Sequence, residues 1–162
     1  NCQSNMKQIG LGILQYVQDY DETMPMYANS GYNWNWDTAV SPYLKNTGVL
    51  RCPSTTGNAT RYGVSYPHIS WTGGGAAMAQ INRSSEVAML FETQYDDGGQ
   101  LKLAYCPVCY PAPATNRSRF GFPLTPRHSE GCNVAYCDGH VKWVKQDTLY
   151  TNPNDLFGHT SK

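Results

Sequence analysis

The sequence contains little charge. Lysine and arginine together number 12, aspartate and glutamate also number 12, and charged residues make up 15% of the 162 residues, against roughly 25% in an average soluble domain. No cluster of basic residues stands out, so we expect no nucleic-acid partner. A neutral, weakly charged surface opposes self-association only weakly. This composition fits a protein that lies beside copies of itself, and it fits many secreted proteins as well.

Long apolar runs are missing too. No stretch approaches the roughly 20 apolar residues that a transmembrane helix needs, and no signal peptide is visible. Yet the chain opens on Asn-Cys-Gln, without an initiator methionine, and is already in helical register. We therefore expect a mature or truncated form from which an upstream segment has been removed.

The familiar signatures of enzyme active sites are absent from the sequence. It has no serine nucleophile elbow, no paired-carboxylate signature and no dinucleotide loop, and the glycines at 73–75 lack the Lys-Ser/Thr of a phosphate-binding loop. Cys137 stands near His140, but neighbouring residues of a strand point to opposite faces, which argues against a Cys-His nucleophile. We expect a protein that is not an enzyme.

The clearest pattern that is present predicts an N-terminal helix. Apolar residues recur at three- and four-residue steps over residues 4–20, beginning with Met6, Ile9 and Ile13, as they do on one face of an α-helix. We expect residues 1–22 to be the lower part of a longer helix.

The chain as a whole is expected to form one α+β domain over residues 1–162. An apolar run at 84–93, bounded by polar residues, predicts a strand inside a variable, loop-rich region at 55–127. At 128–146 two short apolar-polar runs flank an Asp-Gly pair. Asp-Gly is a favoured two-residue turn, because both central positions require positive φ. These residues are therefore predicted to form a C-terminal β-hairpin.

Six cysteines leave two kinds of site open. Cys106 and Cys109 are spaced like half of a zinc knuckle, because two thiolates three residues apart can hold one tetrahedral metal ion. The other half would come from Cys132 and Cys137, which have four intervening residues instead of two, or from His128 and His140. The alternative is disulfide bonding, for which the candidates are Cys2, Cys52, Cys106, Cys109, Cys132 and Cys137.

Three blocks of sequence resemble a known family. They are residues 2–25 (CQSNMKQIGLGILQYVQDYDETMP), 41–55 (SPYLKNTGVLRCPST) and 126–144 (PRHSEGCNVAYCDGHVKWV), and together they cover about a third of the chain. In the third block His128 is followed, after nine residues, by Asp138 and Gly139. The set, in this order, resembles type IV pilins and type II secretion pseudopilins of the bacterial kind that carries a C-terminal His-x9-Asp-Gly motif.

The resemblance implies a precursor with a short basic leader, which a prepilin peptidase removes before the new N-terminus is methylated. An apolar helix of about 20 residues would then span the inner membrane or pack in a filament core. The implied fold is pilin-like: an N-terminal helix packed on a small antiparallel β-sheet, with long disulfide-stapled loops. The implied location is the cell surface or the extracellular space, after initial anchoring in the membrane.

An oxidising exterior favours disulfides over structural zinc for the cysteines. Cys2 and Cys52 are the preferred first pair, since both lie in family blocks near the helix, and the other four cysteines allow three connectivities. Closing a loop of about 50 residues would stabilise the fold by roughly 4 kcal/mol in the chain-entropy model.

The His-x9-Asp-Gly motif is itself a candidate site. One interpretation is a metal or binding site at His128, Asp138 and His140. The favoured interpretation is a hairpin turn to which His128 is hydrogen-bonded, because Asp-Gly already has a structural reason to be there. Some pseudopilins hold calcium in a C-terminal loop, and Asp96, Asp97 and Asp138 could supply oxygen ligands, although no EF-hand spacing exists. We expect no cofactor, with calcium or zinc as the less favoured alternatives.

The function expected from this combination is structural. We expect a subunit that self-assembles into an extracellular filament, pilus or pseudopilus at the bacterial cell surface. Loop aromatics would make the lateral contacts, since aromatic residues dominate interface energetics; the candidates are Tyr32, Trp34, Trp36 and Trp71. The alternative is a surface-anchored pilin-like module that binds glycan or another envelope component through the same rings.

Overall fold

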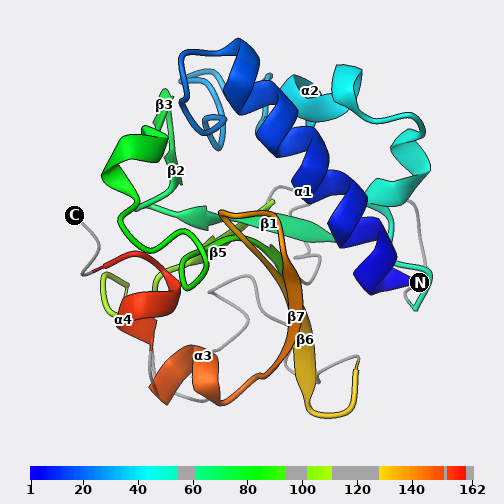
Figure 1. Cartoon of the computed structure of the whole chain (residues 1–162), viewed down its shortest axis with the longest axis vertical. Helices are drawn as coiled ribbons and strands as arrows, with labels where there is room; N and C mark the ends of the chain where they lie inside the picture. The colour runs from blue at the N-terminus through cyan, green and yellow to red at the C-terminus, as the bar shows by residue number, and fades with distance from the viewer. Residues whose placement is uncertain (55–60, 94–101, 111–127, 152, 160–162) are drawn as a thin grey trace.

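The computed structural model describes residues 1–54, 61–93, 102–110, 128–151 and 153–159. Its longest helix lies across a five-stranded sheet (Figure 1). The helices are α1 (Cys2–Asp19), α2 (Trp36–Val40), α3 (Thr148–Thr151) and α4 (Pro153–Leu156), with 3-10 turns η1 (Ser41–Tyr43), η2 (Thr47–Leu50) and η3 (Met78–Gln80). The strands are β1 (Tyr62–Tyr66), β2 (Ser70–Trp71), β3 (Gly74–Gly75), β4 (Ala88–Glu92), β5 (Leu103–Tyr105), β6 (Gly131–Tyr136) and β7 (Val141–Lys145). None of the helices in these ranges combines the length and the apolar content that a membrane crossing requires.

The N-terminal helix follows its predicted apolar stripe. Met6, Ile9 and Ile13 are all buried, at the spacing that one face of an α-helix requires. The predicted N-terminal helix is therefore confirmed. It begins at Cys2, earlier than the Ser4 at which the periodic pattern starts.

Two glycines let α1 lie close to its neighbours. A Cβ atom on Gly10 would lie 3.1 Å from Met89 Cε of β4, and a Cβ atom on Gly12 would lie 2.8 Å from Leu44 Cδ2, just after η1. Each glycine lowers helix stability by about 1 kcal/mol relative to alanine. The close packing of α1 against the sheet and against the segment after η1 offsets that loss.

The sheet is mixed. Its strand order is β5-β1-β4-β6-β7. The β1–β4, β4–β6 and β6–β7 pairs are antiparallel, whereas β1 and β5 are parallel, with Val64 opposite Leu103. The predicted α+β class with an N-terminal helix is confirmed, but the prediction of an antiparallel sheet is wrong at this edge. The reason is that the chain leaves β1, forms β4 on one side of it, and crosses to the other side before β5 begins.

The region at 55–127 holds more regular structure than its composition indicated. Besides the strand predicted at 84–93, which is β4, its described part contains β1, β2, β3, β5 and η3. The sequence of β1 is Tyr-Gly-Val-Ser-Tyr, and four of these five residues are buried. Because both faces of β1 are covered, polar and apolar residues do not alternate along it, and the usual signal of a strand is missing.

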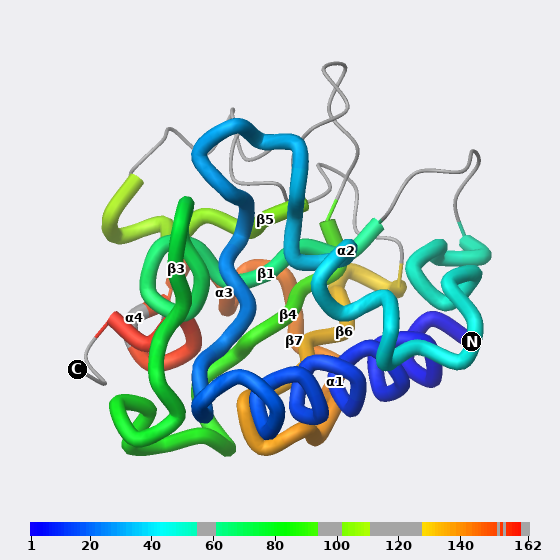
Figure 2. The backbone as a smooth tube through the Cα atoms, turned by 90° about the horizontal axis from the view of Figure 1, so that it is seen from above, coloured from blue at the N-terminus to red at the C-terminus, as the bar shows by residue number. Residues whose placement is uncertain are grey.

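Both faces of the central strands are covered by other elements. Every residue of β4 and β6 is buried. One apolar core lies between the sheet and α1, and the other lies between the sheet and the C-terminal helices, where the rings of Phe91 and Phe157 stack 4.7 Å apart. Figures 1 and 2 show α1 and the two C-terminal helices on different sides of the sheet.

Candidate functional site

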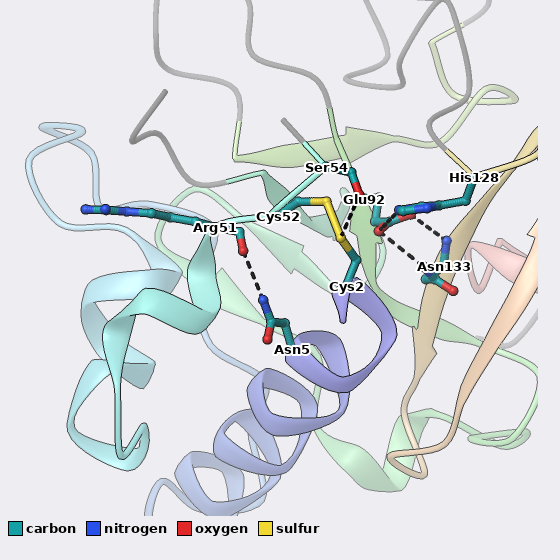
Figure 3. The surroundings of a disulfide bond; sticks show 8 residues. All are labelled: Cys2, Asn5, Arg51, Cys52, Ser54, Glu92, His128 and Asn133. Carbon is teal, nitrogen blue, oxygen red and sulfur yellow. Dashed lines mark hydrogen bonds and ion pairs between the residues drawn. A yellow bond between two sulfur atoms is a disulfide. The ribbon is translucent and has the colours of Figure 1, made fainter. Parts of the chain in front are cut away.

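The three sequence blocks that carry the family resemblance meet at the first turns of α1. Cys2 of the first block and Cys52 of the second form a disulfide, with 5.4 Å between their Cα atoms (Figure 3). One turn further along α1, Asn5 Nδ2 donates a hydrogen bond of 3.0 Å to the carbonyl oxygen of Arg51. The predicted Cys2–Cys52 pair is thereby confirmed.

The third block joins the same helix through the turn of the C-terminal hairpin. Lys7 Nζ donates to the carbonyl oxygen of Gly139 at 2.7 Å. Gly139 has a φ of +87°, and a Cβ atom there would lie 2.8 Å from Leu14 Cδ1 of α1. The motif glycine is thus required twice, for its left-handed backbone and for its close approach to the helix.

The conformation of this turn differs from the predicted one in one respect. The Gly139 N–H donates to the Tyr136 carbonyl oxygen at 2.8 Å, which centres the turn on Cys137 and Asp138. Asp138 is not among the residues of the described ranges that have a positive φ. The expectation that both Asp138 and Gly139 adopt the left-handed conformation is therefore wrong. The two central residues of the turn are Cys137 and Asp138, and Gly139 is its last residue.

A buried carboxylate lies beside the disulfide. Glu92, the last residue of β4, has only 1% of its surface exposed. Its oxygens accept hydrogen bonds from the Asn133 backbone N–H at 2.7 Å and from Asn133 Nδ2 at 3.2 Å, and His128 Nε2 lies 3.0 Å away (Figure 3). A buried carboxylate without such partners would be strongly destabilising. The side chain of the motif histidine therefore contacts β4, and not the hairpin turn as expected; sequence reasoning had not singled out Glu92.

We call Cys2, Cys52, Glu92, His128 and Asn133 the helix-start cluster. The sulfur, carboxylate and imidazole atoms of the first four residues lie within 4.8 Å of one another. The two sulfurs are bonded to each other, so they are not available as thiolate ligands for a metal ion. The arrangement is structural. The disulfide joins α1 to the segment after η2, and the hydrogen bonds of the buried Glu92 carboxylate join β4 to β6.

The aspartate of the motif is engaged within its own turn. Asp138 Oδ1 accepts the backbone N–H of His140 at 3.0 Å and lies 2.6 Å from His140 Nδ1. Burial by itself would raise the pKa of Asp138, but the hydrogen bonds from His140 outweigh it and lower the pKa. His128 lies at the other end of β6, so the three residues of the predicted motif site are not brought together. Asp96 and Asp97, the other calcium candidates, lie outside the described residues.

The two cysteines of the hairpin, which the sequence offered as one possible second half of a zinc site, lie on opposite faces of the sheet. Cys132 packs in the core beside the C-terminal helices, whereas Cys137 packs in the core beside α1, so the sheet separates the two thiols. Burial, followed by the charge of Asp138, raises the pKa of Cys137. This thiol stays protonated at neutral pH, which makes it a poor nucleophile and a poor metal ligand.

Cys106 and Cys109 meet His68 and His159, and not His128 and His140, the histidine pair that the sequence offered. His68 Nε2 lies 3.1 Å from Cys109 Sγ, His159 Nδ1 lies 3.4 Å from the same sulfur, and the two nitrogens are 3.2 Å apart. Cys106 Sγ is within 4.8 Å of all three atoms. We call these four residues the Cys/His cluster.

The aromatic residues predicted to make lateral contacts divide into three kinds. Tyr32 is 53% exposed, and Trp34 and Trp71 are half-buried and pack on the main core. Trp36 is fully buried, and its indole N–H donates to the Lys102 carbonyl oxygen at 2.8 Å. The prediction of a surface role for Trp36 is wrong, because its ring fills the core and its one polar atom is bonded there.

Comparison with protein-family models, with curated proteins and with solved structures gave no match in any of the three cases.

Proposed function

We propose that this chain is a pilin-like structural subunit that assembles into an extracellular filament, pilus or pseudopilus at the bacterial cell surface. The observation that supports the proposal is the meeting of the three family blocks at the start of α1. The Cys2–Cys52 disulfide and the Lys7–Gly139 hydrogen bond join residues that lie far apart in sequence. The three segments that carry the resemblance are therefore bonded to one another through α1.

A helix whose first turn is bonded to the domain suits a subunit that transmits force. The first turn of an isolated helix frays, because its N–H groups lack intrahelical partners and helix nucleation is unfavourable. Here the first helical residue, Cys2, is bonded covalently to the body of the domain. In a pilin-like filament the helix would carry force between the filament core and the globular domain. The disulfide would pass that force into the segment that precedes β1, and Lys7 would pass it to the hairpin.

The solvent face of α1 provides a surface for contact with another copy. Between Gln3 and Gln18 its exposed side chains carry one charge, that of Lys7, and the others include four glutamines. Leu11 lies in the middle of this face and is 47% exposed. Covering such a face requires the desolvation of few charges, and burial of a leucine contributes about 1.5–3 kcal/mol. We assign a lateral subunit contact to this face.

The alternative, a glycan-binding module, is less well supported by the positions of the aromatic side chains. A sugar platform needs several ring faces open on one surface. Trp36 is in the core, and Trp34 and Trp71 are half-buried, which leaves Tyr32 as the one well-exposed ring of the four predicted residues.

The assembly proposal is tested by a charge placed on the α1 face. The variant Leu11→Glu is compared with Thr148→Glu, which adds the same charge at an exposed position of α3, on the other side of the sheet. Cells that produce each variant are sheared, and the amount of chain that sediments as polymer is measured. We expect Leu11→Glu to lower it about tenfold or more and Thr148→Glu to leave it unchanged. Both changes are at exposed positions, so the stability of the purified domain should change by less than about 0.5 kcal/mol. Equal sedimentation of Leu11→Glu and the unaltered chain would contradict the assigned contact.

A further inference from the structure

The Cys/His cluster is assembled by the parallel pair of strands. β1 ends at Tyr66 and β5 ends at Tyr105, and because the strands are parallel their carboxyl ends meet at the same edge of the sheet. The Cys106 N–H donates to the Tyr66 carbonyl oxygen at 2.8 Å and extends the ladder by one residue. His68 and Cys106 therefore leave the sheet side by side.

Cys109 is placed beside Cys106 by a tight turn. The Tyr110 N–H donates to the Cys106 carbonyl oxygen at 3.0 Å and closes a turn over Cys-Pro-Val-Cys. Cys106 is fully buried at the base of the cluster, whereas Cys109 is exposed. Two sulfurs on one such turn are the usual half-site for a tetrahedral metal ion.

The fourth residue comes from the C-terminal end of the described chain. Phe157, just after α4, is fully buried and fixes this segment on the sheet. Gly158 has a φ of +72°, and a Cβ atom there would lie 3.2 Å from Val87 Cγ1 and 3.4 Å from Ile69 Cδ1. The glycine lets the backbone pass beside Ile69, which brings His159 against His68, with their rings perpendicular and 5.0 Å apart.

Three of the six distances between the ligand atoms of the cluster are close to those of a tetrahedral zinc site. Zinc binds sulfur at about 2.3 Å and imidazole nitrogen at about 2.0–2.1 Å; in a regular tetrahedron these bonds place two nitrogens about 3.3 Å apart and a nitrogen and a sulfur about 3.6 Å apart. The nitrogens of His68 and His159 are 3.2 Å apart, and they lie 3.1 and 3.4 Å from Cys109 Sγ. Three edges of the four-donor set therefore agree with a zinc-centred tetrahedron to within about 0.5 Å.

Hydrogen bonding among the side chains does not account for these three short contacts together. Each imidazole nitrogen carries either one proton or one acceptor lone pair. At most two edges of the triangle formed by His68, Cys109 and His159 can then be linear hydrogen bonds, and the third short contact is left without one. A metal cation at the centre would instead accept an electron pair from each of these three atoms and from the Cys106 sulfur.

We propose that His68, Cys106, Cys109 and His159 bind one divalent metal ion of the zinc class in a Cys2His2 site. Four protein donors close the coordination shell, which is the arrangement of a structural metal site and not of a catalytic one. The ion would tie the C-terminal residues after α4 to the β1–β5 edge of the sheet. This role is independent of filament assembly. The second pair of zinc ligands would be His68 and His159, in place of the pairs that the sequence offered.

The experiment uses the full 162-residue chain, purified without chelator and then analysed for metal. We expect about one zinc ion per chain. After removal of zinc, Co²⁺ should restore the site and give the visible bands of a tetrahedral cobalt ion with a sulfur-to-metal charge-transfer band. The metal-free chain should melt about 5–10 °C below the zinc-loaded chain, because metal binding to the native state adds to its stability.

Two ligand variants and one matched control separate a metal site from a fold effect. Cys109→Ser and His159→Gln should each weaken zinc binding at least about tenfold, and Cys109→Ser should abolish the charge-transfer band. His140→Gln, which changes an exposed histidine outside the cluster, should keep full stoichiometry and the same spectrum. A substoichiometric metal content in the unaltered chain would overturn the proposal, and so would equal losses in the His140→Gln control. Detection of a Cys106–Cys109 disulfide by mass spectrometry of the alkylated native protein would also overturn it.

Discussion

Removing the Cys2–Cys52 disulfide measures how much the covalent attachment of α1 contributes to the stability of the domain. The change is the double variant Cys2→Ser with Cys52→Ser, which leaves no lone thiol beside the buried carboxylate. The bond closes a loop with a sequence separation of 50 residues. In the chain-entropy model such a cross-link removes about 14 cal/mol/K from the denatured state, or about 4 kcal/mol at 25 °C. We expect the free energy of unfolding to fall by about that amount.

The assay is urea unfolding followed by circular dichroism. With a denaturant slope of about 2–3 kcal/mol/M, the loss lowers the midpoint by about 1.3–2 M. A reducing agent supplies the control, because the unaltered chain should then unfold at the midpoint of the double variant, while the variant itself should not respond. A midpoint difference below about 0.5 M, or an unaltered chain that is insensitive to reductant, would refute the role given to this bond.

Three further outcomes follow from the motif and from Tyr43, which is partly buried against the main core. Gly139→Ala should destabilise the domain by at least about 1–2 kcal/mol in urea unfolding, because a left-handed φ is unfavourable for alanine and its Cβ would contact α1. His128→Ala should lower stability by about 1–3 kcal/mol, because it removes a partner of a buried carboxylate. His140→Ala should lower it by less than about 1 kcal/mol, because the pair of His140 with Asp138 is exposed. Equal losses in His128→Ala and His140→Ala would be inconsistent with the helix-start cluster. The hydrogen bond to Asp19, followed by burial, raises the pKa of Tyr43 to about 12. The hydrogen bond between Tyr43 and Asp19 therefore stabilises the fold fully below pH 10, and this stabilisation is lost as pH rises through about 12. Tyrosinate absorbance should show this late titration in the unaltered chain but not in Asp19→Asn.

Local sequence patterns predicted the parts of the fold that depend on local interactions. The stripe that begins at Met6 repeats with the period of a helix, so α1 could be found without knowing what it packs against. The apolar run of β4 and the Asp-Gly pair between β6 and β7 are also short-range signals. The Cys2–Cys52 bond was predicted only through the family resemblance, since cysteine spacing alone leaves the connectivity open.

The missed features depend on long-range pairing. The parallel contact of β1 with β5 joins strands that are separated by β4, and no local pattern encodes such a crossing. His68 and His159 became ligand candidates only through that contact and through the approach of the C-terminal residues to the same edge. A histidine placed directly after a strand, with Cys-x-x-Cys directly after another, is the signal that could have suggested them.

Burial of single polar or aromatic residues was equally hard to predict. Trp36 stands in an Asn-rich segment that is typical of a surface loop, yet the carbonyl oxygen of Lys102 accepts its indole N–H and permits full burial. Glu92 ends an apolar strand, and a carboxylate in that position is ordinarily exposed to solvent. Its partners His128 and Asn133 lie about 40 positions later in the chain, just before β6 and within it. A buried carboxylate is tolerated only with such partners.

Electron microscopy of producing cells and of their sheared extracellular fraction, with gold-labelled antibody against this chain, tests filament assembly most directly. A structural subunit predicts ordered fibres that carry the label along their length. Label confined to the cell envelope, with no labelled fibres in either fraction, would contradict the proposed function.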